Sequence, residues 1–355
     1  MEGQDTGCLA KVSGPELASL HPLHHQARLR LTRMLTYATR RILLVIPLLL
    51  GIAALNFLLV SLAPGDPVIY LLADSSDPGL VQTLRERYGL DQPLWERFGA
   101  YISSLLQGNL GQSIAQGRPV LDAILERIPA SAILAGAALW IAAGLGIPLG
   151  LWLAKLSLSH PRLERSAFLG ILLGTGLPPF LLGQLLILLF ALYLGLLPTN
   201  GMFSVRGTPE GFPRLLDLLA HLILPALTLG LQPLAAIARI TRAQALEVMG
   251  QDFVTTARAK GLNERMVHTK HVLRNALPAP ITLLALSSGH WVGGAVITET
   301  VFAWPGLGRL AVESTLARDY PLVIGVILVG AIGVILANLI ADIAVAGLDP
   351  RVRYG

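Results

Sequence analysis

The sequence has little charge and almost no cysteine, and each shortage excludes a class of protein. Only 14% of its residues are charged, while 53% are hydrophobic. A soluble domain carries about 25% charged residues, so this balance argues against an ordinary soluble enzyme. It also excludes a disordered chain, which needs high charge and low hydrophobicity. Cys8 is the single cysteine, so no disulfide can form within the chain.

The motifs of common catalytic and metal sites are also missing. The sequence contains no G-x-x-x-x-G-K-[ST] loop for ATP phosphates, no H-E-x-x-H, no C-x-x-C and no G-x-S-x-G. We therefore expect no catalytic residue, no metal site and no cofactor bound by this chain. Its net charge of +5 does not indicate nucleic-acid binding, because the basic residues lie between apolar runs rather than on one soluble face.

What the sequence does contain is six long apolar runs. About 20 apolar residues are needed to cross the roughly 30 Å hydrocarbon core of a bilayer. We therefore expect an all-α polytopic membrane protein with six transmembrane helices. The first helix is expected at 42–62, and the other five lie within a core domain at 128–348. Those five are expected at 128–154, 167–194, 218–238, 276–298 and 320–341.

One of these helices is expected to be bent. The apolar run that contains 167–194 is too long for a simple crossing. Pro178 and Pro179 lie inside it, and proline removes a backbone hydrogen bond from a helix. We therefore predict a single kinked transmembrane helix with its bend at these prolines.

The distribution of basic residues predicts the orientation in the membrane. With the N-terminus inside, the cytoplasmic segments are 1–41, 155–165, 239–274 and 342–355, and they contain all four lysines. Both termini are then cytoplasmic, and 349–355 form a short tail. Met34 is an alternative start of the chain, in which case 1–33 are an extension.

The segment 63–127 is expected to form an extracytoplasmic loop. Its apolar and aromatic residues recur at helical spacing between glycine and proline breaks. We therefore predict a helical loop, which either caps the transmembrane helices or gates the substrate path.

Glycines recur four residues apart within the apolar runs. The pairs are Gly146 with Gly150, Gly170 with Gly174, and Gly289 with Gly293. This spacing lets two helices approach closely, so it predicts packing and says nothing about a substrate.

Polar residues inside the apolar runs are candidates for the transport path, because such groups are often functional in membranes. His290 lies in the middle of the fifth run, and Gln184 lies in the third. Each has an alternative role in packing. His290 can donate to a neighbouring carbonyl, and Gln184 can form a hydrogen bond between helices.

The cytoplasmic segment 239–274 contains the most informative local pattern. Residues 251–260 have the composition of a helix, and Gly261 suits its left-handed C-terminal cap. Asn263 can cap a second short helix, with Glu264 in its first turn. The resulting helix–glycine–helix hairpin would present Arg258, Lys260 and Arg265 at its surface. These residues leave docking into another protein and contact with anionic lipid equally open.

A group of short motifs resembles importer permeases of the ATP-binding cassette (ABC) superfamily, in their dipeptide, oligopeptide and nickel branch. The loop motif is T-A-R-A-K-G-L at 256–262, followed by H-V-L-R-N-A-L-P at 271–278. Gly261 takes the glycine of the family's E-A-A-x-x-x-G pattern and Ala257 its second alanine, whereas Thr255 and Thr256 depart from it. The other motifs are A-P-G-D-P at 63–67, G-N-L-G-Q-S at 108–113, E-T-V-F-A-W-P-G-L-G-R-L at 299–310, R-D-Y-P at 318–321 and L-D-P-R-V-R at 348–353.

The resemblance implies a type I ABC importer transmembrane domain in a prokaryotic plasma (inner) membrane. A second homologous permease subunit would complete the pathway, and an extracytoplasmic binding protein would deliver the substrate. Two cytoplasmic ATPase subunits would hold ATP and magnesium, and each would receive one hairpin. Ala257 and Gly261 are small enough to let the hairpin backbone sit deep in a groove of the ATPase. The implied coupling residues are Ala257, Arg258, Lys260, Gly261, Asn263, Glu264 and Arg265.

The resemblance also implies a scaffold turn near the outer gate, between the last two apolar runs. Two glycines and a proline favour a tight, non-helical turn. Its two aromatic residues are expected to act as anchors at the membrane interface. The residues of this outer turn are Phe302, Trp304, Pro305, Gly306 and Gly308.

Two other functions are weighed against the importer subunit. A self-sufficient secondary transporter or channel would need ionisable groups inside the membrane or an inverted repeat. An intramembrane enzyme would need paired catalytic residues, and His290 has no evident partner. The apolar runs are almost free of charge, so we expect the importer subunit. Its substrate stays open among peptides, glutathione, nickel and metal chelates.

Overall fold

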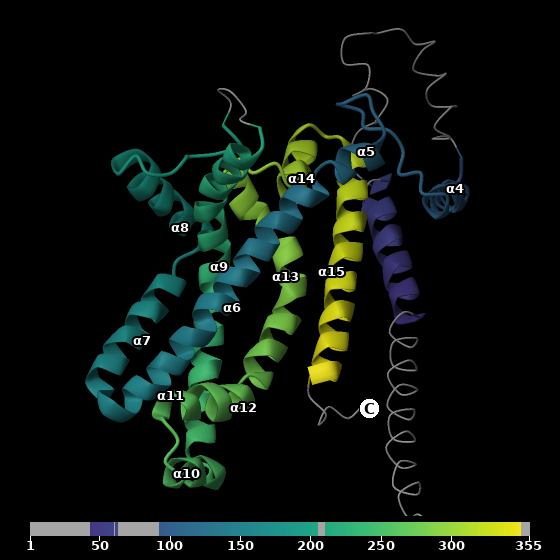
Figure 1. The fold of residues 1–355 in the computed structure, drawn as a ribbon. Coiled ribbons are helices and arrows are strands. Elements are labelled where there is room, and N and C mark those ends of the chain that lie inside the picture. Colours follow the sequence, from purple (N-terminus) through teal and green to yellow (C-terminus); the bar gives the residue numbers. More distant parts are fainter. Residues whose placement is uncertain (1–42, 60, 63–91, 205–209, 349–355) are drawn as a thin grey trace, which may run out of the picture.

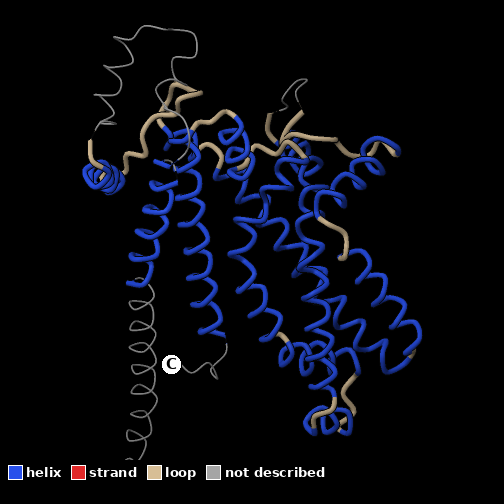
Figure 2. Tube along the Cα trace, turned by 180° about the vertical axis from the view of Figure 1, so that it is seen from behind, coloured by secondary structure: helices blue, strands red, loops and turns tan. Residues whose placement is uncertain are grey.

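The computed structural model describes residues 43–59, 61–62, 92–204 and 210–348. Regular structure in these residues is almost entirely helical, as the fold class predicts (Figures 1 and 2). The terminal segments 1–41 and 349–355 lie outside the described residues. The same holds for residues 63–91 of the predicted outer loop.

Three helices among the described residues are long and apolar enough to cross a membrane. They are α6 (Ile128–Ser159), α9 (Phe212–Met249) and α15 (Tyr320–Leu348). The helix α13 (Pro278–Val301) runs beside α15 (Figure 1). A shorter apolar helix at Leu43–Leu59 represents the first predicted crossing.

The third apolar run is broken into separate helices. The helix α7 (Pro161–Thr175) ends before Pro178, and α8 (Pro179–Leu186) begins after it and continues into the π-helix η1 (Ile187–Tyr193). Proline disfavours helical backbone in the residue before it and lacks an N–H donor. A break replaces the predicted bend for that reason, and α7 starts before the predicted boundary of 167.

The helices α6 and α9 pack closely through glycines. A Cβ atom at Gly150 would lie 2.5 Å from the carbonyl oxygen of Ala238, and one at Gly146 would lie 3.0 Å from the carbonyl oxygen of Leu234. The packing predicted for this glycine pair is confirmed. Gly170 on α7 differs, because no atom lies within 4 Å of a Cβ there. The packing predicted for Gly170 is therefore wrong for the described part of the chain.

Short helices gather at the two ends of the long ones (Figure 1). At one end lie α10 (Asp252–Ala259), α11 (Glu264–Met266), the π-helix η2 (Val267–Leu273) and α12 (Arg274–Ala276). At the opposite end lie α4 (Leu94–Leu106), α5 (Val120–Leu125) and α14 (Leu307–Leu316). The hairpin and the outer turn that the sequence singles out are thus at opposite ends of the molecule.

Replacing Gly150 with leucine is expected to destabilise the contact between α6 and α9. Its Cβ would lie 2.6 Å from the Cβ of Thr241, and overpacking of this kind costs about 1–3 kcal/mol. We expect a lower Tm for the purified protein in detergent. Gly136→Leu on the same helix is the matched control, because nothing lies within 4 Å of a Cβ at Gly136. Equal Tm values for the two variants would contradict this account of the packing.

Candidate functional site

The segment between α9 and α13 folds into the predicted helix–glycine–helix hairpin. The helix α10 ends at Ala259, and Gly261 has a φ of +75°, a left-handed conformation that glycine adopts without strain. The side chain of Asn263 then accepts a hydrogen bond from the backbone N–H of Arg265 at 3.0 Å, which caps α11. The local structure predicted from Gly261 and Asn263 is therefore confirmed. We call residues 252–273 the hairpin.

A small apolar core joins the hairpin to the transmembrane helices. Its buried members are Val254, Ala257, Val267, Val272 and Ala276, together with Ala154 of α6 and Ala245, Val248 and Met249 of α9. Ala257 is only 5% exposed, so its methyl group faces this core. The side chain of Ala257 therefore attaches the hairpin to α6 and α9, and its expected role in the fit to a partner ATPase stays a prediction.

The charged residues of the hairpin face outward. The Nε atom of Arg258 lies 2.8 Å from Oε1 of Glu264, and Nε2 of His268 lies 3.3 Å from Oε2 of the same carboxylate. The hydrogen bond from Arg258 lowers the pKa of Glu264. Because the pKa is lowered, the ion pair is complete above the usual carboxyl range and is lost only as pH falls through the lowered value.

Two further cations of the hairpin have no partner in the described part of the chain. Lys260 and Arg265 are exposed, and their side chains form no hydrogen bond or ion pair with other described residues. Gly261 lies between them in sequence, with open space around it. The tip of the hairpin therefore combines unpaired positive charge with exposed backbone.

At the opposite end, the outer turn is built around a buried carboxylate. Glu299 is 0% exposed and accepts hydrogen bonds from the hydroxyl of Ser131 at 2.7 Å and from the backbone N–H of Arg309 at 3.0 Å. A Cβ at Gly306 would collide with this carboxylate, and one at Gly308 would lie 3.0 Å from its Oε2 atom. The carboxylate therefore excludes a side chain at Gly306, whereas at Gly308 the closest obstacle is the Cα atom of Val296, 2.6 Å from the position of a Cβ.

The aromatic residues of the outer turn point into the protein. Trp304 is 0% exposed and Phe302 is 1% exposed. The indole N–H of Trp304 donates to the carbonyl oxygen of Ala130 on α6 at 2.8 Å, and a Cβ at Gly183 on α8 would lie 3.1 Å from the ring of Phe302. The expectation of anchors at the membrane interface is wrong, because both rings attach the turn to neighbouring helices. Pro305, which follows Trp304, is half-buried.

A second buried carboxylate lies near the outer turn. Asp319, at the start of α15, accepts hydrogen bonds from the hydroxyl of Ser113 and from the backbone N–H groups of Ile114 and Ala115. It joins two of the sequence motifs, 108–113 and 318–321, which are far apart in the chain. Asp319 is 0% exposed, so these hydrogen bonds fully replace water as its partner.

Sequence reasoning did not select Glu299 or Asp319 as site residues. A signal was present in each case, since each is an isolated acid at the end of an apolar run. Glu299 is also followed by two glycines at positions 306 and 308. What could not be predicted was the donor that each acid meets, because Ser131 and Ser113 are distant in sequence.

The described part of the outer loop packs on the helices. Val120 and Ile124 of α5 are buried against Leu310 of α14 and Leu322 of α15. This contact fits the capping alternative for residues 63–127. Gating stays a prediction.

The two pathway candidates lie on different helices. His290 lies within α13, but its side chain is outside the described residues. Gln184 of α8 is exposed and has no hydrogen bond with any described residue. Its alternative role as a hydrogen bond between helices is therefore not found among the described residues. Among the residues that the structure describes, no three His, Cys, Asp or Glu side chains gather to hold a metal.

Comparison with known families adds a second line of evidence. Residues 146–354 match the family model described as binding-protein-dependent transport system inner membrane component. Residues 34–135 match the model for the N-terminal region of the same kind of membrane component. The two matches together cover most of the chain.

Curated relatives match along nearly the whole sequence. The oligopeptide transport system permease protein AppB of Bacillus subtilis (strain 168) is 37% identical over 326 residues, which cover 90% of this chain and 100% of the relative. The glutathione transport system permease protein GsiC of Escherichia coli (strain K12) is 38% identical over 321 residues, with the same two coverages of 90% and 100%. The similarity therefore includes both the hairpin and the outer turn.

A solved structure has a similar fold. A chain of the MetNI methionine ABC transporter, in inward-facing conformations, matches with a TM-score of 0.52 and 17% sequence identity. The match covers 64% of this chain and 97% of that chain. At this identity the similarity concerns the fold, and it agrees with the predicted fold of a type I ABC importer permease.

Replacing Glu299 with glutamine is expected to destabilise the outer turn. The amide keeps the shape but places an NH₂ group toward donors such as the backbone N–H of Arg309, and an unsatisfied buried polar group costs about 1–3 kcal/mol. We expect a lower Tm for the purified protein in detergent. Glu313→Gln is the matched control, because the Glu313 carboxylate is 44% exposed and, among the described residues, pairs with Arg309 at the surface. A Glu299→Gln protein as stable as the control would refute the role of this carboxylate.

Proposed function

This chain belongs to the family of binding-protein-dependent transport system inner membrane components, and from that premise we propose that it forms one half of the pathway of an ABC importer. Members of this family that match the chain are permease subunits. The observation that carries the rest is the hairpin, which is held rigidly on α6 and α9 and has an unpaired cationic tip. An element that transmits force from a separate motor needs this combination of exposed surface and rigid attachment.

The helix α6 connects the hairpin at one end of the molecule to the outer turn at the other. Its 32 residues give a length of about 48 Å at 1.5 Å per residue. Ala154 near one end belongs to the core that holds the hairpin. Ala130 and Ser131 near the other end bind Trp304 and Glu299. We propose that movement of the hairpin reaches the outer turn through this helix.

The ATPase subunits supply the energy in this proposal. Closing of two nucleotide-loaded ATPases would push each hairpin, and the apolar core would transmit the displacement to α6 and α9. The chain itself would bind no cofactor, since ATP and magnesium would stay on the ATPases. A second homologous permease subunit would complete the pathway, and an extracytoplasmic binding protein would deliver the substrate.

The proposed arrangement has six transmembrane helices in a prokaryotic inner membrane, with both termini in the cytoplasm. The hairpin and the turn between α6 and α7 lie at the same end of the molecule (Figure 1). Both are rich in lysine and arginine, which favours the cytoplasmic side. The outer turn, α4 and α5 would then face the binding protein.

We propose short peptides as the substrate class. The names of two relatives, which concern an oligopeptide and glutathione, support this choice. Both molecules consist of amino acids in amide linkage, so they share backbone hydrogen-bonding groups. Nickel or a metal chelate is the alternative substrate, to be separated from peptide by measuring what the cognate binding protein retains.

Labelling at position 260 tests the orientation. In a Cys8→Ser background, Lys260→Cys supplies the single cysteine of the chain, at an exposed position. A membrane-impermeant maleimide is expected to label it in inside-out vesicles and not in intact spheroplasts. Labelling in intact spheroplasts would place the hairpin outside and reject the orientation.

Replacing Gly261 with leucine is expected to uncouple or disassemble the importer. The left-handed φ at Gly261 costs about 1–2 kcal/mol for other residues, and the side chain would project from the exposed tip. We expect uptake of a labelled oligopeptide to fall at least tenfold.

The matched control for this variant is Gly250→Leu, just before the hairpin. Gly250 has a φ of −80°, and a Cβ there would have an ordinary contact of 3.5 Å with the carbonyl oxygen of Glu247. Its uptake should stay near that of the unmodified importer. Normal uptake in the Gly261→Leu protein would count against the coupling role of the hairpin.

A further inference from the structure

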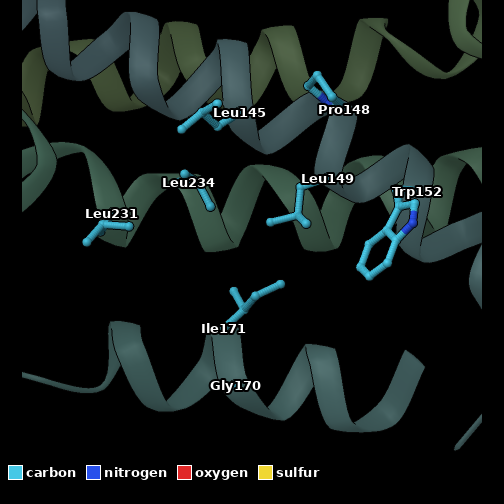
Figure 3. A pocket seen from close by; sticks show the side chains of 8 residues that line it. All are labelled: Leu145, Pro148, Leu149, Trp152, Gly170, Ile171, Leu231 and Leu234. Carbon is cyan, nitrogen blue, oxygen red and sulfur yellow. The ribbon is translucent and has the colours of Figure 1, made fainter. Parts of the chain in front are cut away.

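An apolar groove opens between α7 and the central helix pair. It has a volume of about 550 Å³. Figure 3 shows α7 opposite α6 and α9, with Ile171 pointing across the gap. We call it the membrane groove, and its lining residues are Leu145, Pro148, Leu149, Trp152, Gly170, Ile171, Leu231 and Leu234. All of these are apolar except for the indole N–H of Trp152.

Gly170 helps to keep the membrane groove open. It had the spacing of a packing glycine, yet no atom lies within 4 Å of a Cβ at this position. No described helix of this chain therefore fills the space beside it. The groove lies in the membrane-crossing part of the helices, where the surrounding medium is hydrocarbon.

A second hollow, with a volume of about 500 Å³, lies at the turn that joins α6 to α7. We call it the basic turn, and it is lined by His160, Pro161, Arg162, Leu163 and Arg165. The side chains of Arg162 and Arg165 are exposed and have no hydrogen bond or ion pair with any described residue.

The single acid of the basic turn does not neutralise these arginines. Glu164 is 6% exposed, and its Oε1 atom lies 2.8 Å from Nε of Arg242 on α9. Its charge is therefore directed toward α9. The start of α7 adds backbone N–H groups and the positive end of the helix dipole to the same hollow. The basic turn thus has a net positive charge that lacks a partner.

The separation of the two hollows matches the dimensions of a phospholipid. Along α6, Trp152 is eight residues from His160, or about 12 Å. Along α7, Gly170 is five residues from Arg165, or about 8 Å. One leaflet of hydrocarbon is about 15 Å thick, so a lipid with its phosphate at the turn would place its acyl chains beside the groove. Trp152 lies at the groove end nearest the turn, as tryptophans at membrane interfaces do.

We propose that the basic turn and the membrane groove together bind one anionic phospholipid. Arg162 and Arg165 bind the headgroup phosphate by charge-assisted hydrogen bonds, and the membrane groove holds the acyl chains. Basic pockets between helices on the cytoplasmic side have the chemistry that recognises such headgroups. The choice of the inner leaflet rests on the proposed orientation, whereas the binding itself does not.

Native mass spectrometry of the complete purified importer in detergent tests this site. Phosphatidylglycerol and phosphatidylcholine with the same acyl chains are added separately. We expect the intact complex to retain phosphatidylglycerol at least tenfold more strongly. In Arg162→Gln/Arg165→Gln, the affinity for phosphatidylglycerol should fall about thirtyfold, since each basic residue near anionic lipid contributes about fivefold.

Three comparisons make the result specific. Gly170→Phe fills the membrane groove and should weaken the binding of both lipids, whereas Gly136→Phe, at an equally open position of α6, should not. Arg97→Gln/Arg214→Gln removes two positive charges at the opposite end of the molecule and should leave lipid binding unchanged. Soluble glycerol phosphate should not displace the lipid, because it lacks acyl chains.

Equal retention of the two lipids by the unmodified complex would overturn the proposal. Unchanged phosphatidylglycerol binding in Arg162→Gln/Arg165→Gln, or in Gly170→Phe, would do the same. Native mass spectrometry measures lipid binding independently of peptide uptake and of labelling at position 260. A failure here therefore leaves the proposed function standing, and a failure of coupling leaves the lipid site standing.

Discussion

The close contact between α6 and α9 is the constraint on which the rest of the structure depends. Backbone lies almost against backbone at Gly150 and Gly146, where even a methyl group would collide with carbonyl oxygens or neighbouring side chains. Two long helices packed in this way have little room to shift against each other, since protein interiors have few voids to absorb a displacement. The hairpin attaches to both helices at one end, and the outer turn attaches to α6 at the other.

The outer end is organised by buried carboxylates rather than by apolar packing alone. Glu299 and Asp319 each accept hydrogen bonds from a serine hydroxyl and from backbone N–H groups, which belong to the first turn of α14 for Glu299 and to a loop for Asp319. A buried charge is costly unless its hydrogen bonds are complete, so each carboxylate strongly favours one arrangement of the surrounding loop. The carboxylate of Glu299 thus links the outer turn and the start of α14 to α6.

Local features of the candidate site were predictable because their causes lie within a few residues. The left-handed backbone at Gly261 and the cap at Asn263 depend on those residues and their immediate neighbours. Burial was predicted less well. Trp304 was expected at the membrane interface, yet it faces the interior of this chain. The break at Pro178 was foreseen as a bend, because proline chemistry indicates an interruption but not its angle.

The sequence by itself determined that the chain resides in a membrane, where the hairpin turns and which family it resembles, because composition and short motifs carry that information. Tertiary structure alone decided which distant residues meet. Ser113 binds Asp319 across 206 positions, and Ser131 binds Glu299 across 168. Hydrogen bonds at such separations form only after the helices between them have packed, so no local pattern records them. The membrane groove has the same origin, since Gly170 faces open space only because α7 stands away from α6 and α9.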